Sequence, residues 1–355
     1  MQMPMKMMWG PMWLPALPPD AARLFAWHPQ PIPVLPGLCV LLLVGYLAGV
    51  IAMYRKHHRW PIGRVVSWVL GVLSIALVTG TGIGGYGMGM FSVHMVQHMV
   101  LSMLSPILLL LARPVTLALR SLPTGHGRRG RYRRGLLRVL RSKPARVIAS
   151  PALTLPIFIL SLYGLYFTPL FDILMRNWFG HTAMLLHFLA IGLALFWPIL
   201  ALDPNPHKAS AGMRLIELFI AVPFHAIFGV VVMTSPVLIV AFFKHPPMAW
   251  HVDLLADQDM AGGIAWAFAE IPTLIVLIAV FMQWKRSSDR QAARYDRSEL
   301  RTGDQSLQEY NAWLASIAAR DGARPRPGSD AVGPPTVPTV PAETDSHQAA
   351  TPRPT

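Results

Sequence analysis

Long uncharged runs of apolar residues are the feature that most limits how this chain can fold. A helix needs about 20 such residues to cross the hydrocarbon core of a bilayer, and only helices or closed barrels satisfy their backbone hydrogen bonds there. The chain has 53% hydrophobic and only 14% charged residues, whereas soluble proteins carry about 25% charged residues. The sequence therefore predicts an all-α membrane bundle of seven spanning helices, at residues 34–53, 65–81, 94–112, 148–167, 180–200, 215–242 and 262–283.

The basic residues predict how this bundle is oriented. Lysine and arginine gather in the cytoplasmic connections of membrane proteins. Eleven of the 31 lysines and arginines lie in residues 113–147 and ten follow residue 284, whereas the connection 82–93 has none. We therefore expect the N-terminus outside and the C-terminus inside, in a multi-pass protein of the bacterial cytoplasmic membrane. Topology and anionic lipid headgroups account for the net charge of +14, and we expect no nucleic-acid partner because no binding motif accompanies it.

Composition divides the chain into three regions. Residues 1–33 form a Met- and Pro-rich leader that is predicted to be extracytoplasmic, and residues 34–284 form the membrane domain. Residues 285–355 form a cytoplasmic tail, first charged and then Pro-rich, whose end is expected to be disordered. The leader begins MQMPMKMMWGPMW. Such a tract suits Cu(I) outside the cytoplasm, and is equally well explained as an unselected leader.

Histidines and methionines gather at the predicted outer ends of several spans. His94 and His98 are one helical turn apart and share a face, and a polar group in a spanning segment is a functional candidate because its burial in hydrocarbon is costly. Imidazole and thioether together suit copper better than magnesium or calcium, and the single Cys39 excludes a CxxC motif. The predicted copper ligands are His94, His98, His181, His187, His245 and His251, with Met95 and Met99 as possible soft ligands, and with Asp257, Glu270 and His225 supporting the ligands or carrying protons.

Three segments, in the right order, resemble the CtaG proteins that are associated with caa3-type cytochrome c oxidases. They are HMVQHMVLSMLSPILLLLARPVTLALR at 94–120, HTAMLLHFLAIGLALFWP at 181–198 and DQDMAGGIAWAFAE at 257–270. The resemblance covers residues 33–285, so the leader and the tail lie outside it. The chain departs from the family pattern at Ala112 and Arg113, where a glycine is usual before the proline, and at Asp259, which replaces a commonly uncharged residue. Neither departure removes a candidate ligand.

The resemblance implies an assembly factor for haem–copper oxidase that helps to deliver or insert copper at the outer side of the membrane. Its partners would be cytochrome c oxidase subunits and an extracytoplasmic copper donor protein, and copper would be held transiently. We expect no enzymatic activity, because the sequence contains no GxSxG or HExxH motif.

Three alternatives remain open. Histidines on different spans could ligate haem b axially in a redox protein, with His98 paired to His187 or His187 to His225. A copper transporter would need ligands that continue into the cytoplasmic half of the membrane, where the sequence offers few. A scaffold for oxidase subunits would need no metal.

Overall fold

The structure is a computed structural model that describes residues 10–125, 127, 130–206, 210–302 and 305–322. Within these residues the regular elements are all helices, and Trp27 and Thr81 form an isolated β-bridge. The all-α prediction is therefore confirmed. Chain contacts divide the molecule into two units, Met1–Asp289 and Arg290–Thr355. The predicted disorder at the end of the tail concerns residues outside the described part of the chain.

Six helices in the described residues are long and apolar enough to cross a membrane. The seventh predicted span is the apolar helix α10 (Pro151–Tyr166), which at 16 residues is shorter than the usual 17–25 or so. The seven-span topology and the orientation of the termini therefore stay predictions. The six long helices are α2 (Val34–Arg55), α3 (Ile62–Gly80), a composite helix over Phe91–Ser121, α12 (Trp178–Leu200), α13 (Ala211–Thr234) and α14 (Leu254–Thr302).

The composite helix is built from four short helices, and further short helices lie elsewhere in the described part of the chain. The composite helix consists of α5 (Phe91–Met99), the π-helix η2 (Val100–Leu104), α6 (Ser105–Leu111) and α7 (Pro114–Ser121). The other short elements are α1 (Ala21–Phe25), α4 (Ile83–Tyr86), α8 (Arg131–Leu140), α9 (Lys143–Ile148), α11 (Leu170–Met175), η3 (Ala241–Lys244), η4 (Met248–Trp250) and α15 (Gln305–Gly322).

The sixth helix ends earlier than predicted. The sequence pattern extended this span to residue 242, but α13 ends at Thr234 and the chain is non-helical over residues 235–240. Pro236 explains the difference, because a proline pushes the preceding residue out of the helical region. Ser235 accordingly has extended backbone angles, with φ −68° and ψ 124°.

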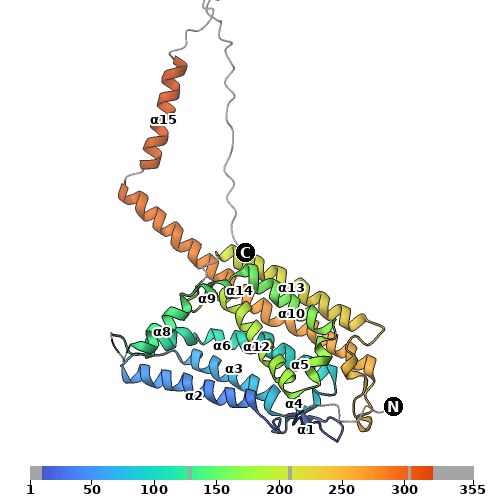
Figure 1. Cartoon of the computed structure of the whole chain (residues 1–355). Coiled ribbons are helices and arrows are strands. Elements are labelled where there is room, and N and C mark those ends of the chain that lie inside the picture. The colour runs from blue at the N-terminus through green and yellow to red at the C-terminus, as the bar shows by residue number, and fades with distance from the viewer. Residues whose placement is uncertain (1–9, 126, 128–129, 207–209, 303–304, 323–355) are drawn as a thin grey trace, which may run out of the picture. The chain divides into compact units, whose positions relative to one another are not determined.

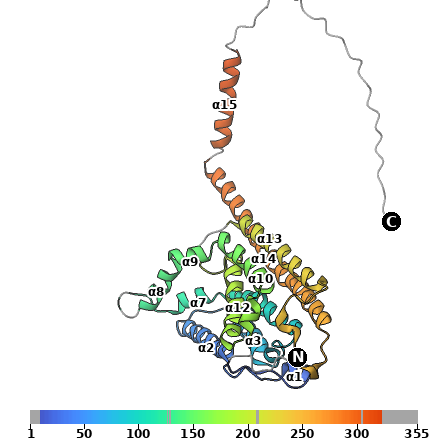
Figure 2. The ribbon, with the colours of Figure 1, turned by 45° about the vertical axis from the view of Figure 1, so that its right-hand side comes forward.

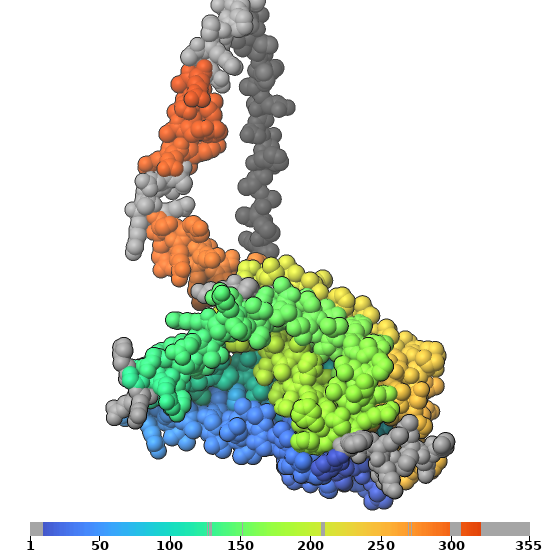
Figure 3. Space-filling model, viewed as in Figure 1, coloured from blue at the N-terminus to red at the C-terminus, as the bar shows by residue number. Residues whose placement is uncertain are grey.

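The composite helix lies in the interior of the bundle. Its α6 segment packs against α3 and α12, α2 packs on α3, and α10 packs against both α12 and α13. Figures 1 and 2 show this arrangement, and in Figure 3 α2 (blue) and α13 (yellow) lie along opposite borders of the visible face. The residues of the composite helix are mostly buried by these neighbours, so its polar side chains face protein rather than lipid.

A π-turn interrupts the composite helix. Pro106 has no N–H, so the α-helical bond to the Ser102 carbonyl cannot form. The Ser105 N–H donates to the Val100 carbonyl, five residues back, rather than to a carbonyl four residues back. Gly192 of α12 lies against this widened turn, where a β-carbon would collide with the Ser102 carbonyl oxygen. Such turns occur frequently at functional sites, and this one directly follows Met99.

The described part of the leader, residues 10–33, is fastened across the end of the bundle where α3 ends, and we call it the strap. The His28 N–H donates to the Gly80 carbonyl at 2.9 Å. The Gln30 side chain accepts from the Trp13 N–H at 2.7 Å and donates to the Gly84 carbonyl at 3.2 Å. These bonds join the two ends of the strap to each other, and fasten it to the last residue of α3 and to α4.

Candidate functional site

Four histidines from three helices are buried in the bundle. His94 and His98 lie on α5, His181 on the first turn of α12, and His225 near the middle of α13. Their exposed fractions are 0%, 4%, 3% and 2%. Three of them were predicted as ligands, whereas His225 was predicted in a supporting role. Each sits on the buried face of its helix, so the bundle encloses four imidazole rings in its apolar interior.

His225 and Met99 are in direct contact. The Nε2 atom of His225 lies 3.3 Å from the Met99 Sδ atom, and the ring centroids of His98 and His225 are 6.3 Å apart. For an ion about 2.0 Å from nitrogen and about 2.3 Å from sulfur, bond lengths typical of such ligands, a 3.3 Å separation subtends roughly 100°. This angle lies in the range of tetrahedral coordination, so the His225 nitrogen and the Met99 sulfur can share an ion. The ring of His98 lies beside this pair.

Aromatic side chains surround these donors. The ring of His98 lies 4.2 Å from that of Phe188 on α12, and the ring of His225 lies 5.9 Å from that of Phe158 on α10. Both phenylalanines are buried. The site therefore has apolar walls, which disfavour a hydrated divalent cation more strongly than a monovalent one because desolvation costs more as charge increases.

Tyr166 orients His98. Its hydroxyl lies 3.1 Å from the His98 Nδ1 atom, and the tyrosine is 1% exposed. A ring held at Nδ1 presents Nε2 to a ligand, which is the arrangement that supporting hydrogen bonds give to metal-binding histidines. Sequence reasoning missed Tyr166, because it ends an apolar helix and only the fold brings it to the His98 ring, 68 positions away.

His94 occupies an aromatic chamber one turn from His98. Neither of its ring nitrogens has a hydrogen-bond partner among the described residues. Its ring meets that of Phe171 edge-on at 4.9 Å, with Phe243 at 6.0 Å and Phe188 at 6.1 Å. The helix α12, whose first turn carries His181, packs against α5. A buried imidazole without partners is costly, and such a group calls for a functional explanation.

The other predicted ligands lie elsewhere. His187 is on the exposed side of α12, hydrogen-bonded to Ser161, and His245, His251 and Glu270 are also exposed. Met95 is fully buried in the hydrophobic core. Within the described residues no group of three or more His, Cys, Asp or Glu side chains could hold a metal ion. A site of the predicted kind therefore needs the thioether of Met99, and the roles assigned to these other residues stay predictions.

Asp257 positions the helix that carries His94 and His98. Its carboxylate accepts hydrogen bonds from the Phe91 N–H at 2.6 Å and from the Ser92 N–H at 3.3 Å, and it also bonds the Ser92 hydroxyl. These are the free N–H groups at the start of α5, and a negative charge there also stabilises the helix dipole. Asp257, which was predicted in a supporting role, thus bonds the backbone of α5 at Phe91, 166 positions away in sequence.

A second buried polar cluster lies towards the other end of α13. Glu217 accepts a hydrogen bond from the Thr154 hydroxyl at 2.9 Å. Arg214 donates to the Ile199 carbonyl at 3.1 Å and to Gln283 at 3.2 Å. Arg214 directly precedes the predicted span 215–242, and Glu217 lies inside that span. An ionisable residue within an apolar run is itself a signal of a polar cluster.

The fold and this site define a class: helical membrane proteins with a buried histidine–methionine cluster. Residues 44–287 match the family described as cytochrome c oxidase caa3 assembly factor (Caa3_CtaG). The match covers more than half of the chain and includes the four buried histidines, so the chain belongs to this family. The resemblance drawn from the three sequence segments is therefore confirmed.

Three mycobacterial proteins are similar to this chain. They are uncharacterised proteins of Mycobacterium bovis and Mycobacterium tuberculosis, each 39% identical over 305 residues, and of Mycobacterium leprae, 38% identical over 305 residues. The matched region covers 85% of this chain and 46% of each relative. The chain thus spans about half the length of the curated relatives it matches. No solved structure matches the chain.

Proposed function

We propose that this protein assists assembly of a caa3-type cytochrome c oxidase by holding a cuprous ion within the membrane and passing it to the oxidase. Its family supports the assembly role, and six apolar helices support a multi-pass membrane protein. The partners would be oxidase subunits and an extracytoplasmic copper donor protein, at the bacterial cytoplasmic membrane.

The contact between His225 and Met99, with His98 beside it, is the observation that carries this proposal. Thioether and imidazole ligands favour Cu(I) over hard cations. The three ligands are neutral, so the loaded site bears a single positive charge, which an apolar interior tolerates better than two. Few and uncharged ligands also suit transfer, because an ion that must be passed on needs bonds that exchange.

The test is to purify the full chain in detergent and measure bound copper and haem together. We expect about one Cu(I) per chain, no Soret band, and loss of copper in the double variant His98→Ala, His225→Ala. His187→Ala is the matched control, because this histidine is exposed and should leave copper unchanged. The variant His94→Ala, His98→Ala tests the pair that the sequence singled out.

The alternatives give different results in the same measurement. If the wild-type protein binds haem, the result would favour a redox function over copper delivery. A protein that binds neither copper nor haem would be a scaffold for oxidase subunits.

The oxidase itself gives a second test. In cells that carry the double variant, copper delivery predicts that the oxidase accumulates with less copper per complex. A scaffold predicts instead that the amount of oxidase falls while each remaining complex keeps its copper.

A further inference from the structure

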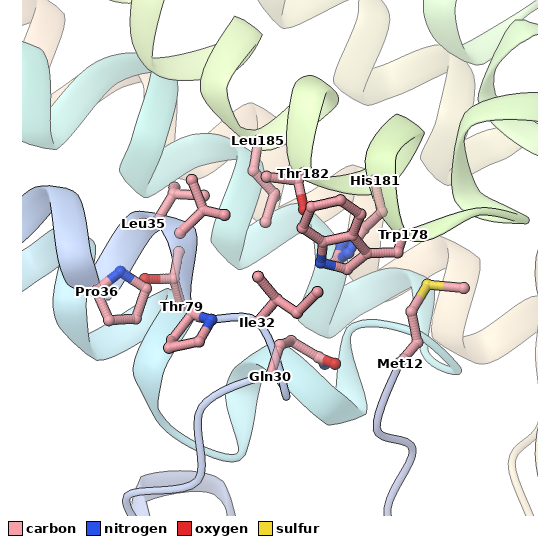
Figure 4. A pocket seen from close by; sticks show the side chains of 12 residues that line it. Met12, Gln30, Ile32, Leu35, Pro36, Thr79, Trp178, His181, Thr182 and Leu185 are labelled. Atoms are coloured by element: carbon pink, nitrogen blue, oxygen red, sulfur yellow. The ribbon is translucent and has the colours of Figure 1, made fainter. Parts of the chain in front are cut away.

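A small cavity lies beneath the strap, next to the buried end of α12. Figure 4 shows its lining, with Trp178 and Met12 at one side of the view and Leu35 and Pro36 at the other. His181 also lines this cavity. Its volume is about 20 Å³, enough for one water molecule or one ion, since a single water needs about 10–15 Å³.

Two side chains give this cavity a soft-ligand character. His181 is 3% exposed, and its Nε2 atom has no hydrogen-bond partner among the described residues. Met12 adds a thioether from the strap. The neighbouring side chains Leu35, Pro36 and Leu185 are apolar, so the free nitrogen and the sulfur are suited to a weakly hydrated ion.

The cavity lies at the start of a series of imidazoles that leads to the buried site. The helix α12, which carries His181, packs against α5, which carries His94. His94 is one helical turn from His98 on the same face of α5. The ring of His98 lies 6.3 Å from that of His225. An ion could pass along this series by exchanging one neutral ligand for the next, with no change in its charge.

The strap fixes the methionine at this position. Gln30 bonds both the N–H and the carbonyl of Trp13, at 2.7 and 3.2 Å, and the Trp13 ring stacks on His28 at 3.6 Å. Met12 therefore directly precedes Trp13, whose backbone N–H and carbonyl are both hydrogen-bonded by Gln30. These contacts hold the strap in a defined conformation, which the composition of the leader alone does not predict.

We infer that the cavity under the strap is the capture site for Cu(I), in which Met12 and His181 receive the ion before it moves past His94 to His98, Met99 and His225. This inference rests on the proposed function and names the route by which its site is loaded. The chemical class of the ligand is a monovalent soft cation, and Ag(I) should follow the same route.

Loading kinetics of the full chain in detergent test the route. A coloured Cu(I)–chelator complex is mixed rapidly with the protein, and its loss of colour reports transfer. We expect Met12→Leu and His181→Gln each to slow loading about tenfold or more, with the final copper content unchanged. Thr182→Val is the matched control, because Thr182 lines the same cavity and its replacement removes neither nitrogen nor sulfur. Loading of both variants at the wild-type rate would overturn the inference.

An equilibrium measurement supplies an independent check. In a titration of the His98→Ala, His225→Ala variant, which lacks both nitrogen ligands of the buried site, the capture site should still bind Cu(I) weakly. Adding Met12→Leu or His181→Gln should abolish that residual binding. Residual binding that survives both substitutions would also overturn the inference. Met12→Leu conserves volume, so it remains informative if His181→Gln fails to fold. A wild-type protein that binds no Cu(I) would defeat the proposed function, whereas unaltered loading in the variants defeats only the route.

Discussion

The Nε2 atom of His225 and the Sδ atom of Met99 lie 3.3 Å apart, although 126 positions separate them in sequence. The contact joins α13 to the last residue of α5. It places a nitrogen and a sulfur donor at a distance that one ion can bridge, and His98 is the neighbouring residue of Met99. Copper binding should therefore depend on a small number of side chains, each of which can be tested separately.

Met99→Leu should weaken Cu(I) binding by about tenfold or more, because it removes the sulfur ligand while nearly conserving side-chain volume. Competition against a Cu(I) chelator measures the affinity. Met103→Leu is the control, since Met103 is also buried and lies on the same composite helix. Equal affinities for the two variants would exclude Met99 as a ligand.

Tyr166→Phe should lower Cu(I) affinity by about 10–100-fold, the usual effect of losing a group that orients a metal-binding histidine. The substitution removes only the hydroxyl that contacts His98. Tyr163→Phe serves as the comparison, because Tyr163 is on the same helix as Tyr166 and its hydroxyl donates to the Phe224 carbonyl of α13 at 2.8 Å. If both variants keep wild-type affinity by chelator competition, Tyr166 does not position the ligand.

Asp257→Ala should destabilise the protein by about 1–3 kcal/mol, because the N–H groups of Phe91 and Ser92 lose their buried acceptor. Thermal unfolding in detergent, followed by circular dichroism, measures the change. Asp259→Ala provides the reference: this carboxylate is exposed on the same helix, and its loss should change stability by less than about 0.5 kcal/mol. Similar melting curves for the two variants would contradict the capping role.

Gly192→Ala should destabilise the bundle by about 1–3 kcal/mol or prevent its assembly, because the added β-carbon meets the Ser102 carbonyl oxygen of the π-turn. Gly45→Ala is the matched substitution, since a β-carbon there meets no atom within 4 Å. The comparison is made from unfolding temperature and from the yield of monodisperse protein. A stable Gly192→Ala variant would mean that α12 does not approach the π-turn closely.

The membrane helices and their family could be predicted from the sequence, but the set of ligands could not. The apolar runs predicted α2, α3 and α12 to within a few residues, because length and hydropathy alone decide whether a segment can cross a bilayer. The composite helix continues to Ser121, nine residues beyond the end of the predicted span. Pro236 shortened α13, and the prediction overran it because an apolar run continues beyond that proline. The motif around His94 and His98 indicated the family correctly, since it is a local pattern.

What the tertiary structure decided is which histidines meet. His187 and Phe188 are adjacent in sequence, yet Phe188 contacts His98 whereas His187 is exposed, because successive residues of a helix point about 100° apart. In a soluble helix a polar face would reveal this rotation, but a membrane helix is apolar all round, and lipid tails are as apolar as leucine. The sequence by itself determined that this chain places imidazoles and thioethers in a membrane. Close contacts between helices, such as that of Gly192 with the π-turn, determined that His225 meets Met99 and lies beside His98.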